Sequence, residues 1–448
     1  MSQENSQTAG LPTLSSSMIW MINFGFLGVQ TAFTLQSSQM SRIFQTIGAD
    51  PNNLGWFFIL PPLAGLIVQP IIGYYSDRTW APKLGGRRIP YLLLGTIVAV
   101  IVMLLLPNSG SFGFGYGSLA ALWFGAITVA FLDLSSNVAM QPFKMMVGDM
   151  VNDDQKSYAY GVQSFLSNTG AVLAAIFPFL LTLMGVANKA PKGVVPQSVI
   201  ISFYVGAALL VITSLFTIFR VHEYDPATYA KYHGISEADN KEGGNWLTLL
   251  RHAPKAFWTV TLVQFFCWFA FQYLWTYSAG AIASNVWGTT NASSVGYQDA
   301  GNWYGVLAAV QSIAAVIWSY VLAKVPNKYH KLGYAGSLLL GAIGFISVFY
   351  IHDKWTLIIS YTLVGIAWAG MNTYPLTIVT NALSGKHMGT YLGLFNGSIC
   401  LPQIVASLLS FVLFPMLGGS QVHMFLLGGV VMILAALSVG TIHETYVR

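Results

Sequence analysis

One acidic residue of this sequence lies apart from the other charged groups. Of the fifteen Asp and Glu residues, fourteen lie in polar segments or at the ends of apolar ones, whereas Asp133 lies near the middle of the apolar run 118–147. A charged carboxylate in hydrocarbon costs about 2.5 to 3.5 kcal/mol on insertion scales, and desolvation favours its neutral form. We therefore interpret Asp133 as a group that takes up a proton and releases it when its surroundings change. The alternative is a carboxylate tied permanently to a neighbouring helix.

Further polar residues follow Asp133 at helical spacing. Asn137 and Lys144 come four and eleven residues later and return to nearly the same helix face, with Gln141 about a quarter-turn away. Lys144 lies about 16 Å along the helix axis, too far for a direct ion pair with Asp133. We predict that Lys144 takes part in coupling as a second gate. The alternative is a lysine that extends its ammonium group to the aqueous interface.

Carboxamide side chains also interrupt the apolar runs. They both donate and accept hydrogen bonds, which suits a ligand with many hydroxyl groups better than an ion or a lipid. The predicted substrate cavity comprises Gln30, Gln36, Asp133, Asn137, Gln141, Gln272 and Asn396. For each carboxamide the alternative is a hydrogen bond between helices. The ring faces of Trp268, Tyr273, Trp275 and Tyr277 could pack against a sugar ring, or else against lipid and other helices.

A charged cluster follows the second apolar run. Asp77 and Arg78 precede the sequence Gly-Gly-Arg-Arg, which ends in Arg87 and Arg88. We predict a charge network that holds one conformation of the protein closed, so these four residues are candidate gating residues. The alternative is a basic loop that serves only to orient the chain in a membrane.

The sequence does not predict an enzyme. It has no nucleotide-binding loop, no paired His and Glu at metal-ligand spacing and no nucleophile elbow. None of the eight histidines is placed in the middle of an apolar run, and one lone carboxylate supplies few ligands for a hard cation. We therefore expect no metal and no cofactor.

Composition shows which elements position these residues. With 55% hydrophobic and 8% charged residues and a mean hydropathy of +0.61, the chain is predicted to be an all-α membrane protein. Basic residues are scattered between apolar runs and form no patch, which argues against nucleic acid as a partner. Twelve runs are long enough to cross a bilayer: 17–45, 54–76, 90–107, 118–147, 157–187, 197–220, 255–286, 301–324, 333–351, 355–383, 388–416 and 422–442.

The charge distribution predicts orientation and domain organisation. With the N-terminus inside, sixteen of the twenty Lys and Arg residues fall on the inner side, so both termini are expected in the cytoplasm. The four that fall outside are Arg42, Lys189, Lys192 and Lys354. The polar segment 221–253 is interpreted as a cytoplasmic linker between six-helix bundles at 1–220 and 254–448. This layout of two pseudo-symmetric six-helix bundles is that of the major facilitator fold.

The chain resembles the sucrose–proton symporters and their relatives in the glycoside-transporting branch of the major facilitator superfamily. The resemblance spans both halves. It rests on Gly28-Val-Gln30 with Leu35-Gln36, on Val68-Gln69-Pro70 running into Gly73-Tyr-Tyr-Ser-Asp77-Arg78 and Gly86-Arg87-Arg88, on Asp133 with Asn137, Gln141, Pro142 and Lys144, and on Asn396 with Pro402-Gln403.

The resemblance implies inward, proton-driven transport of a disaccharide by alternating access, with Asp133 as the proton site that also meets the sugar. Two departures from the plant pattern, Lys144 in place of Arg and no acid between Trp268 and Tyr277, resemble the bacterial branch, whose members are associated with maltose and other α-glucosides as well as sucrose. We expect the protein to be a multi-pass monomer in the lipid bilayer of the plasma membrane, which would be a bacterial inner membrane. An uncoupled facilitator or exporter and a non-transporting sugar sensor remain alternatives.

Overall fold

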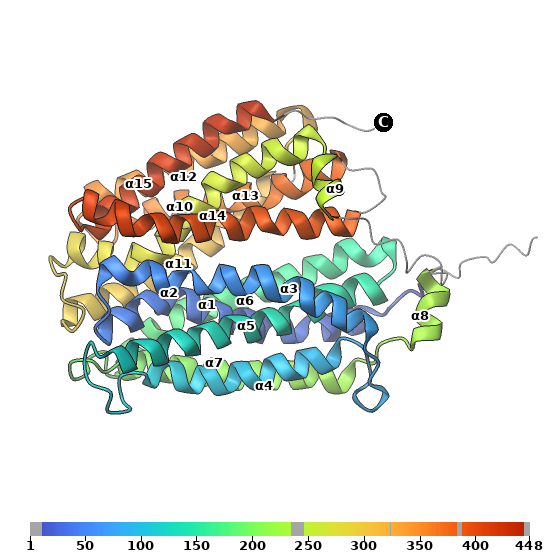
Figure 1. The fold of residues 1–448 in the computed structure, drawn as a ribbon, viewed down its shortest axis with the longest axis horizontal. Helices are drawn as coiled ribbons and strands as arrows, with labels where there is room; N and C mark the ends of the chain where they lie inside the picture. The colour runs from blue at the N-terminus through green and yellow to red at the C-terminus, as the bar shows by residue number, and fades with distance from the viewer. Residues whose placement is uncertain (1–10, 234–245, 323, 383–387, 443–448) are drawn as a thin grey trace, which may run out of the picture.

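Long helices form almost the whole of the computed structural model, which describes residues 11–233, 246–322, 324–382 and 388–442 (Figure 1). The long helices are α1 (Ser16–Thr46), α3 (Leu60–Arg78), α4 (Ile89–Leu105), α5 (Leu119–Met150), α6 (Asp153–Leu183), α7 (Gln197–Arg220), α10 (Lys255–Val286), α11 (Val295–Leu322), α12 (His330–Tyr350), α13 (Leu357–Ala382), α14 (Met388–Met416) and α15 (Gln421–Ser438). Three shorter helices are α2 (Leu54–Phe58), α8 (Pro226–His233) and α9 (Trp246–Arg251).

The prediction of an all-helical membrane fold is confirmed. Among the described residues, eleven helical stretches are long and apolar enough to cross a bilayer, and α13 supplies a further long helix in the same arrangement. Each long helix corresponds to one of the twelve predicted runs. Two details differ. The second run is divided into α2 and α3, where Pro61 and Pro62 lack the N–H groups that a continuous helix needs.

The other difference lies at the start of α11. This helix begins at Val295, six residues before the predicted 301, because Ser294 Oγ accepts a hydrogen bond from Tyr297 N and so caps the first turn. Asp299, which the sequence analysis placed in a loop, therefore lies within the helix.

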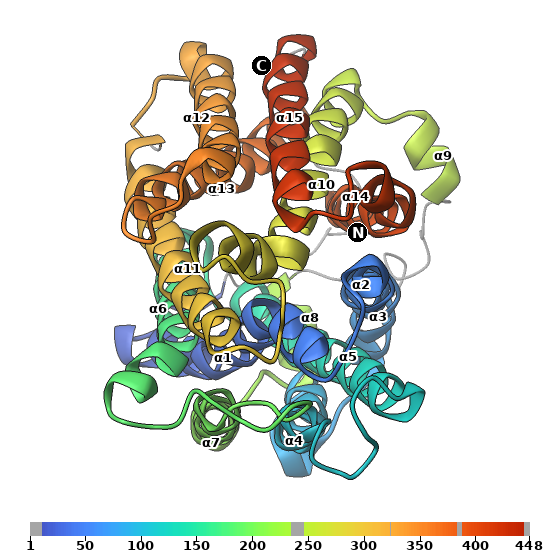
Figure 2. The same ribbon diagram turned by 90° about the vertical axis from the view of Figure 1, so that its left-hand side faces the viewer.

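The helices form two bundles, as the view along their axes shows (Figure 2). One bundle contains α1 and α3 to α7, and the other contains α10 to α15. Where they meet, α11 packs against α6, and α14 packs against α2 and α3. The approach of α11 to α6 requires a glycine, because a Cβ atom on Gly305 would lie 2.1 Å from the carbonyl oxygen of Ala175.

The two ends of the molecule differ in the elements they carry. At the terminal end, α1 begins, α15 ends, and α8 and α9 lie (Figure 1). At the opposite end, which we call the far end, α1 gives way to η1 (Pro51–Asn53) and α15 begins. The two bundles are bound to each other there: Ser41 donates to the carbonyl oxygen of Thr276, and Gln45 is hydrogen-bonded to Gln421.

Local sequence features set the ends and the shape of α5, the helix that carries Asp133. Ser118 Oγ accepts from Ala121 N at the start of the helix and so satisfies one of its free donors. Pro142 lies inside the helix between Asp133 and Lys144, and it removes one backbone hydrogen bond from that interval. Membrane helices tolerate such a proline where neighbouring groups satisfy the freed carbonyl.

Candidate functional site

Asp133 lies at the middle of α5 and is buried, with 1% of its surface exposed. Its Oδ1 accepts a hydrogen bond from Gln36 Nε2 at 3.3 Å, and its Oδ2 accepts one from Asn137 Nδ2 at 2.8 Å. Asn137 comes from the next turn of the same helix, whereas Gln36 comes from α1. The structure therefore brings together three residues of the predicted cavity.

The carboxamide of Gln36 has a second polar atom at this point. Its Oε1 is buried and has no hydrogen-bond partner among the described residues. A buried amide oxygen without a partner costs free energy, and it offers an acceptor to a hydroxyl group or to a protonated carboxyl group. Gln36 is thus able to respond both to a ligand and to a proton on Asp133.

A pocket beside Asp133 draws its walls from both bundles. Its lining combines carboxamides, a carboxyl, a hydroxyl and aromatic rings, which is the mixture that a hydroxyl-rich organic ligand requires. The lining residues are Phe33, Gln36, Ser37, Met40, Phe58, Pro61, Asp133, Gln272, Trp275 and Gln403. Among the four aromatic residues of α10 that the sequence singled out, Trp275 lines this pocket, whereas Trp268, Tyr273 and Tyr277 are buried.

Gln272 lines the pocket and also joins the two bundles. Its Nε2 donates to the carbonyl oxygen of Phe58 at 2.7 Å and to Ser407 Oγ at 2.9 Å. Phe58 belongs to α2 of one bundle, and Gln272 and Ser407 belong to α10 and α14 of the other. The amide nitrogen is therefore already satisfied without a ligand.

Other predicted cavity residues lie outside this lining. Gln30 donates to Thr34 Oγ1 of its own helix at 3.4 Å, and Asn396 donates to Cys400 Sγ at 3.9 Å. Gln141 is half-buried. Cys400 nevertheless lies near Asn137, since a Cβ on Gly65 would be 3.8 Å from Cys400 Sγ and from Asn137 Oδ1.

Lys144, the predicted second gate, is exposed. Helix α5 runs from the far end of the molecule to its terminal end, so Lys144 lies closer to the terminal end than Asp133 does. Among the residues that the structure describes, no group of three His, Cys, Asp or Glu side chains comes together as a metal site would require.

The predicted gating cluster is partly described. Arg87 Nη2 and Arg88 Nε both bind Asp149 Oδ2, at 3.3 and 3.0 Å, and the Arg87 guanidinium lies 3.8 Å from the ring centroid of Tyr229 on α8. The side chains of Asp77 and Arg78 lie outside the described residues.

Glu223 adds a carboxyl group to the same cluster. Its Oε1 accepts from the backbone N–H groups of Arg88 and Ile89 at the start of α4. Burial raises the pKa of Glu223, and the hydrogen bonds from the backbone of Arg88 and Ile89 oppose this effect. The cluster thus fixes the start of α4 to the ends of α5 and α7.

Sequence reasoning missed three residues that the structure places in charged networks: Asp149, Glu223 and Arg42. Asp149 and Glu223 lie at helix ends, where an acid gives no distinctive signal. Arg42 was counted only as a charge on the outer side, whereas the structure shows that it lies in α1 with no exposed surface. Gln39 and Gln45 flank Arg42 three residues away on either side, and these carboxamides were a signal that its donors could be satisfied internally.

Comparison with known proteins identifies the architecture. Residues 22–407 match the Major Facilitator Superfamily. The chain belongs to this superfamily and is therefore a multi-pass membrane transporter, not an enzyme. It is 23% identical over 422 residues to the sucrose transport protein SUC4 of Arabidopsis thaliana, with 85% of this chain and 81% of the relative covered. It is 25% identical over 442 residues to the sucrose transport protein SUT5 of Oryza sativa subsp. indica, covering 85% and 79%.

Solved structures agree on the fold. The nucleoside transporter NupG superimposes with a TM-score of 0.67 at 14% identity, over 96% of this chain and 100% of that one. A bacterial homologue of the human lysosomal transporter Spinster, in an inward-facing and unoccupied conformation, gives a TM-score of 0.64 at 14% identity, over 98% and 96%. The prediction of the major facilitator fold and of a sucrose–proton symporter-like member is confirmed.

Proposed function

We propose that this transporter is a proton-coupled symporter that imports a disaccharide, an α-glucoside such as sucrose or maltose, by alternating access. Asp133 is the proton carrier. The observation that carries the proposal is the contact of this buried carboxyl group with Gln36 and Asn137 beside a pocket lined from both bundles. The sucrose transport proteins among its relatives support a sugar as the substrate.

The partners of Asp133 favour reversible protonation. The described residues form no salt bridge with it, and its two side-chain partners are neutral amides. An ionised carboxylate accepts from both amides, and a protonated one can turn its hydroxyl toward Gln36 Oε1. A carboxylate with a purely structural role would be expected to have a buried cation as its partner.

The pocket lining favours a sugar. Gln36, Ser37, Gln403 and Asp133 offer donors and acceptors for hydroxyl groups, and Trp275 offers a ring face for the C–H surface of a pyranose. Asn137 completes the polar side of the site. Lys144, Gln141, Gln30 and Asn396 stay proposed contacts along the path through the bundle.

The closed contact at the far end supports alternating access. At the far end the bundles are held together by hydrogen bonds such as Ser41 to Thr276 and Gln45 to Gln421. We assign the terminal end to the cytoplasm because short basic segments resist translocation. On this assignment the outer entrance is closed, the linker 221–253 between the halves 1–220 and 254–448 is cytoplasmic, and the protein works as a monomer in a bacterial cell membrane.

Uptake into reconstituted vesicles tests the proposal. We expect sucrose or maltose to accumulate when an inward proton gradient is imposed, and a protonophore to abolish accumulation. A membrane potential would add to this driving force, since 100 mV supplies about 2.3 kcal/mol for each proton that enters with the sugar. Asp133→Asn should abolish accumulation but retain sugar exchange, because an amide hydrogen-bonds without releasing a proton.

The exposed Asp353 provides a matched control, because Asp353→Asn removes an acid that does not line the pocket. This variant should accumulate sugar as the parent does. Accumulation by Asp133→Asn at the parent's level would refute the proton role. Equilibration without accumulation by the parent would indicate an uncoupled facilitator or exporter, and binding without any flux would indicate a sensor.

A further inference from the structure

Arg42 is a fully buried cation at the far end of α1. Its side chain has no exposed surface, although the residue lies in the last two turns of a helix that ends at Thr46. Arginine carries five N–H donors in a rigid planar group and stays charged under ordinary conditions. Burying such a group without partners is prohibitive, so the partners determine its role.

The partners of Arg42 come from both bundles. On α11, Gln298 Oε1 accepts from Nε at 2.7 Å and Asn302 Oδ1 accepts from Nη1 at 2.7 Å. On its own side, Asn188 Oδ1 accepts from Nη2 at 2.7 Å and Gln39 Oε1 accepts from Nη1 at 3.3 Å. One side chain therefore makes four hydrogen bonds, two of which cross between the bundles.

All four acceptors are neutral amide oxygens. The nearby acid, Asp299, is not a hydrogen-bond partner of Arg42: its Oδ1 accepts from Asn188 Nδ2 at 2.9 Å, and Asn188 Oδ1 accepts from Arg42. A guanidinium with a direct carboxylate partner would be hard to separate from it. Amide oxygens are partners that water can replace when the bundles separate, so this contact can open and close.

The surroundings are shaped for this side chain. A Cβ atom on Gly301 would lie 2.6 Å from Arg42 Cδ, so the glycine leaves the space that the side chain occupies. The two α11 acceptors are themselves held from the opposite bundle: Gln298 Nε2 donates to Thr46 Oγ1 and Asn302 Nδ2 donates to Thr182 Oγ1.

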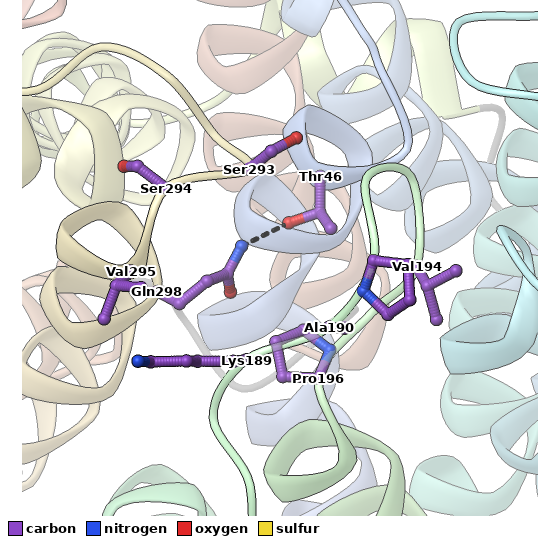
Figure 3. Close-up of a pocket in the computed structure, with 10 residues that line it drawn as sticks. Thr46, Lys189, Ala190, Val194, Pro196, Ser293, Ser294, Val295 and Gln298 are labelled. Carbon is purple, nitrogen blue, oxygen red and sulfur yellow. Dashed lines mark hydrogen bonds between the residues drawn. The ribbon is translucent and has the colours of Figure 1, made fainter.

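Gln298, which binds Arg42, also lines an indentation at the far end. This indentation has a volume of about 160 Å³ and is lined from one side by Thr46, Lys189 and neighbouring residues and from the other by Ser293 to Val295 and Gln298. Figure 3 shows the Gln298 to Thr46 hydrogen bond across it. Lys189 is also a cation at this mouth, but it is exposed.

We propose that Arg42 is the gating residue of the far end: its hydrogen bonds to Gln298 and Asn302 close the route to the Asp133 pocket, and their hydration opens it. The proposal rests on transport by alternating access but on neither the sugar nor the proton. Arg42 acts on access and does not contact the ligand.

Accessibility of the pocket from the far side tests this proposal. Ser37 lines the pocket, so Ser37→Cys reports access, and the two native cysteines are buried and give the background. A membrane-impermeant maleimide is applied, without sugar or proton gradient, to vesicles whose far end faces outward. Adding Arg42→Gln should raise the labelling rate about tenfold, as expected for the loss of a charged hydrogen bond.

Two further variants complete the experiment: one should change the labelling rate in the opposite direction, and the other is a control. Asn302→Asp places a carboxylate beside the guanidinium and should lower the labelling rate and the rate of sugar uptake by about tenfold. Lys189→Gln removes a cation at the same mouth that lacks this contact, and it should leave labelling unchanged.

A purely structural role predicts a different outcome. It would lower the melting temperature of Arg42→Gln while labelling from the far side stayed at the parent's rate, and that result would overturn the proposal. The labelling assay uses no substrate, so it is independent of the uptake experiment. If uptake showed no sugar–proton coupling, the labelling result would still be valid. If labelling refuted the gating role, the uptake result would still be valid.

Discussion

Gln36 on α1 and Asp133 on α5 are joined by a hydrogen bond of 3.3 Å between Nε2 and Oδ1. The other carboxyl oxygen of Asp133 is bound by Asn137 of its own helix. Among the described residues, Gln36 is therefore the side chain through which another helix contacts this carboxyl group. A change in the charge of Asp133 acts on α1 at this point.

Substituting Gln36 should weaken sugar binding. We expect Gln36→Met to lower the affinity for the sugar about ten- to hundredfold. The variant lacks the buried amide donor and acceptor, and loss of their hydrogen bonds costs about 1 to 3 kcal/mol. Titration of the purified variant with sucrose and maltose measures this. Gln163 is the matched control: it is buried and donates to Asn23 Oδ1 and to the carbonyl oxygen of Phe143. Gln163→Met should lower the melting temperature and spare affinity, and equal affinities for both variants would contradict the assignment.

Substituting both arginines at the start of α4 should slow transport more than it weakens sugar binding. In Arg87→Gln with Arg88→Gln, the ion pairs with Asp149 are lost, but the pocket is left intact. We expect the maximal rate of uptake to fall about tenfold while affinity changes less than about threefold. Lys83 lies exposed in the same loop, and Lys83→Gln should transport as the parent does. A tenfold loss of affinity with an unchanged rate would refute the gating role.

Glu223 should make stability depend on pH. Because its folded-state pKa is raised above the ordinary value of 4.5, the folded protein keeps this proton to a higher pH than the unfolded chain does. Its contribution to stability is therefore present below about pH 4.5 and is lost as pH rises through the folded pKa. Glu223→Gln does not titrate, so the melting temperature of the parent relative to the variant should fall as pH rises from 4.5. A constant difference across thermal melts at several pH values would contradict this expectation.

Gly305→Ala should destabilise the contact between the bundles. The added methyl group would lie 2.1 Å from the carbonyl oxygen of Ala175, so α11 and α6 would have to move apart. Overpacking of this kind costs about 1 to 3 kcal/mol. A Cβ atom on Gly336 of α12 would have no neighbour within 4 Å, so Gly336→Ala should keep or raise the melting temperature. Equal melting temperatures for Gly305→Ala and Gly336→Ala would contradict this prediction.

Sequence alone predicted much of the fold because helix length and apolar composition are local properties. The runs 255–286 and 388–416 coincide with α10 and α14, and the four-residue spacing of Asp133 and Asn137 places them in contact. The start of α11 was predicted six residues late because the capping hydroxyl of Ser294 lies in a polar stretch that resembles a loop.

The candidate site was harder to predict, because a site depends on which helices meet. Gln36 and Gln30 look equivalent in the sequence, yet only Gln36 contacts Asp133, since a helix turns by more than a full turn between them. The burial and the contacts of Arg42 could not be predicted, because its partners on α11 lie more than 250 positions away in the sequence. No local pattern reveals such partners.

Gln272 links occupancy of the pocket to a contact between the two bundles. Its amide nitrogen is committed to Phe58 and Ser407, and the same side chain lines the pocket beside Asp133. A ligand that draws on these two hydrogens takes them from the contact between the bundles. Filling the pocket and holding α2 against α10 and α14 therefore compete for one amide, so a ligand bound through Gln272 weakens this contact between the bundles.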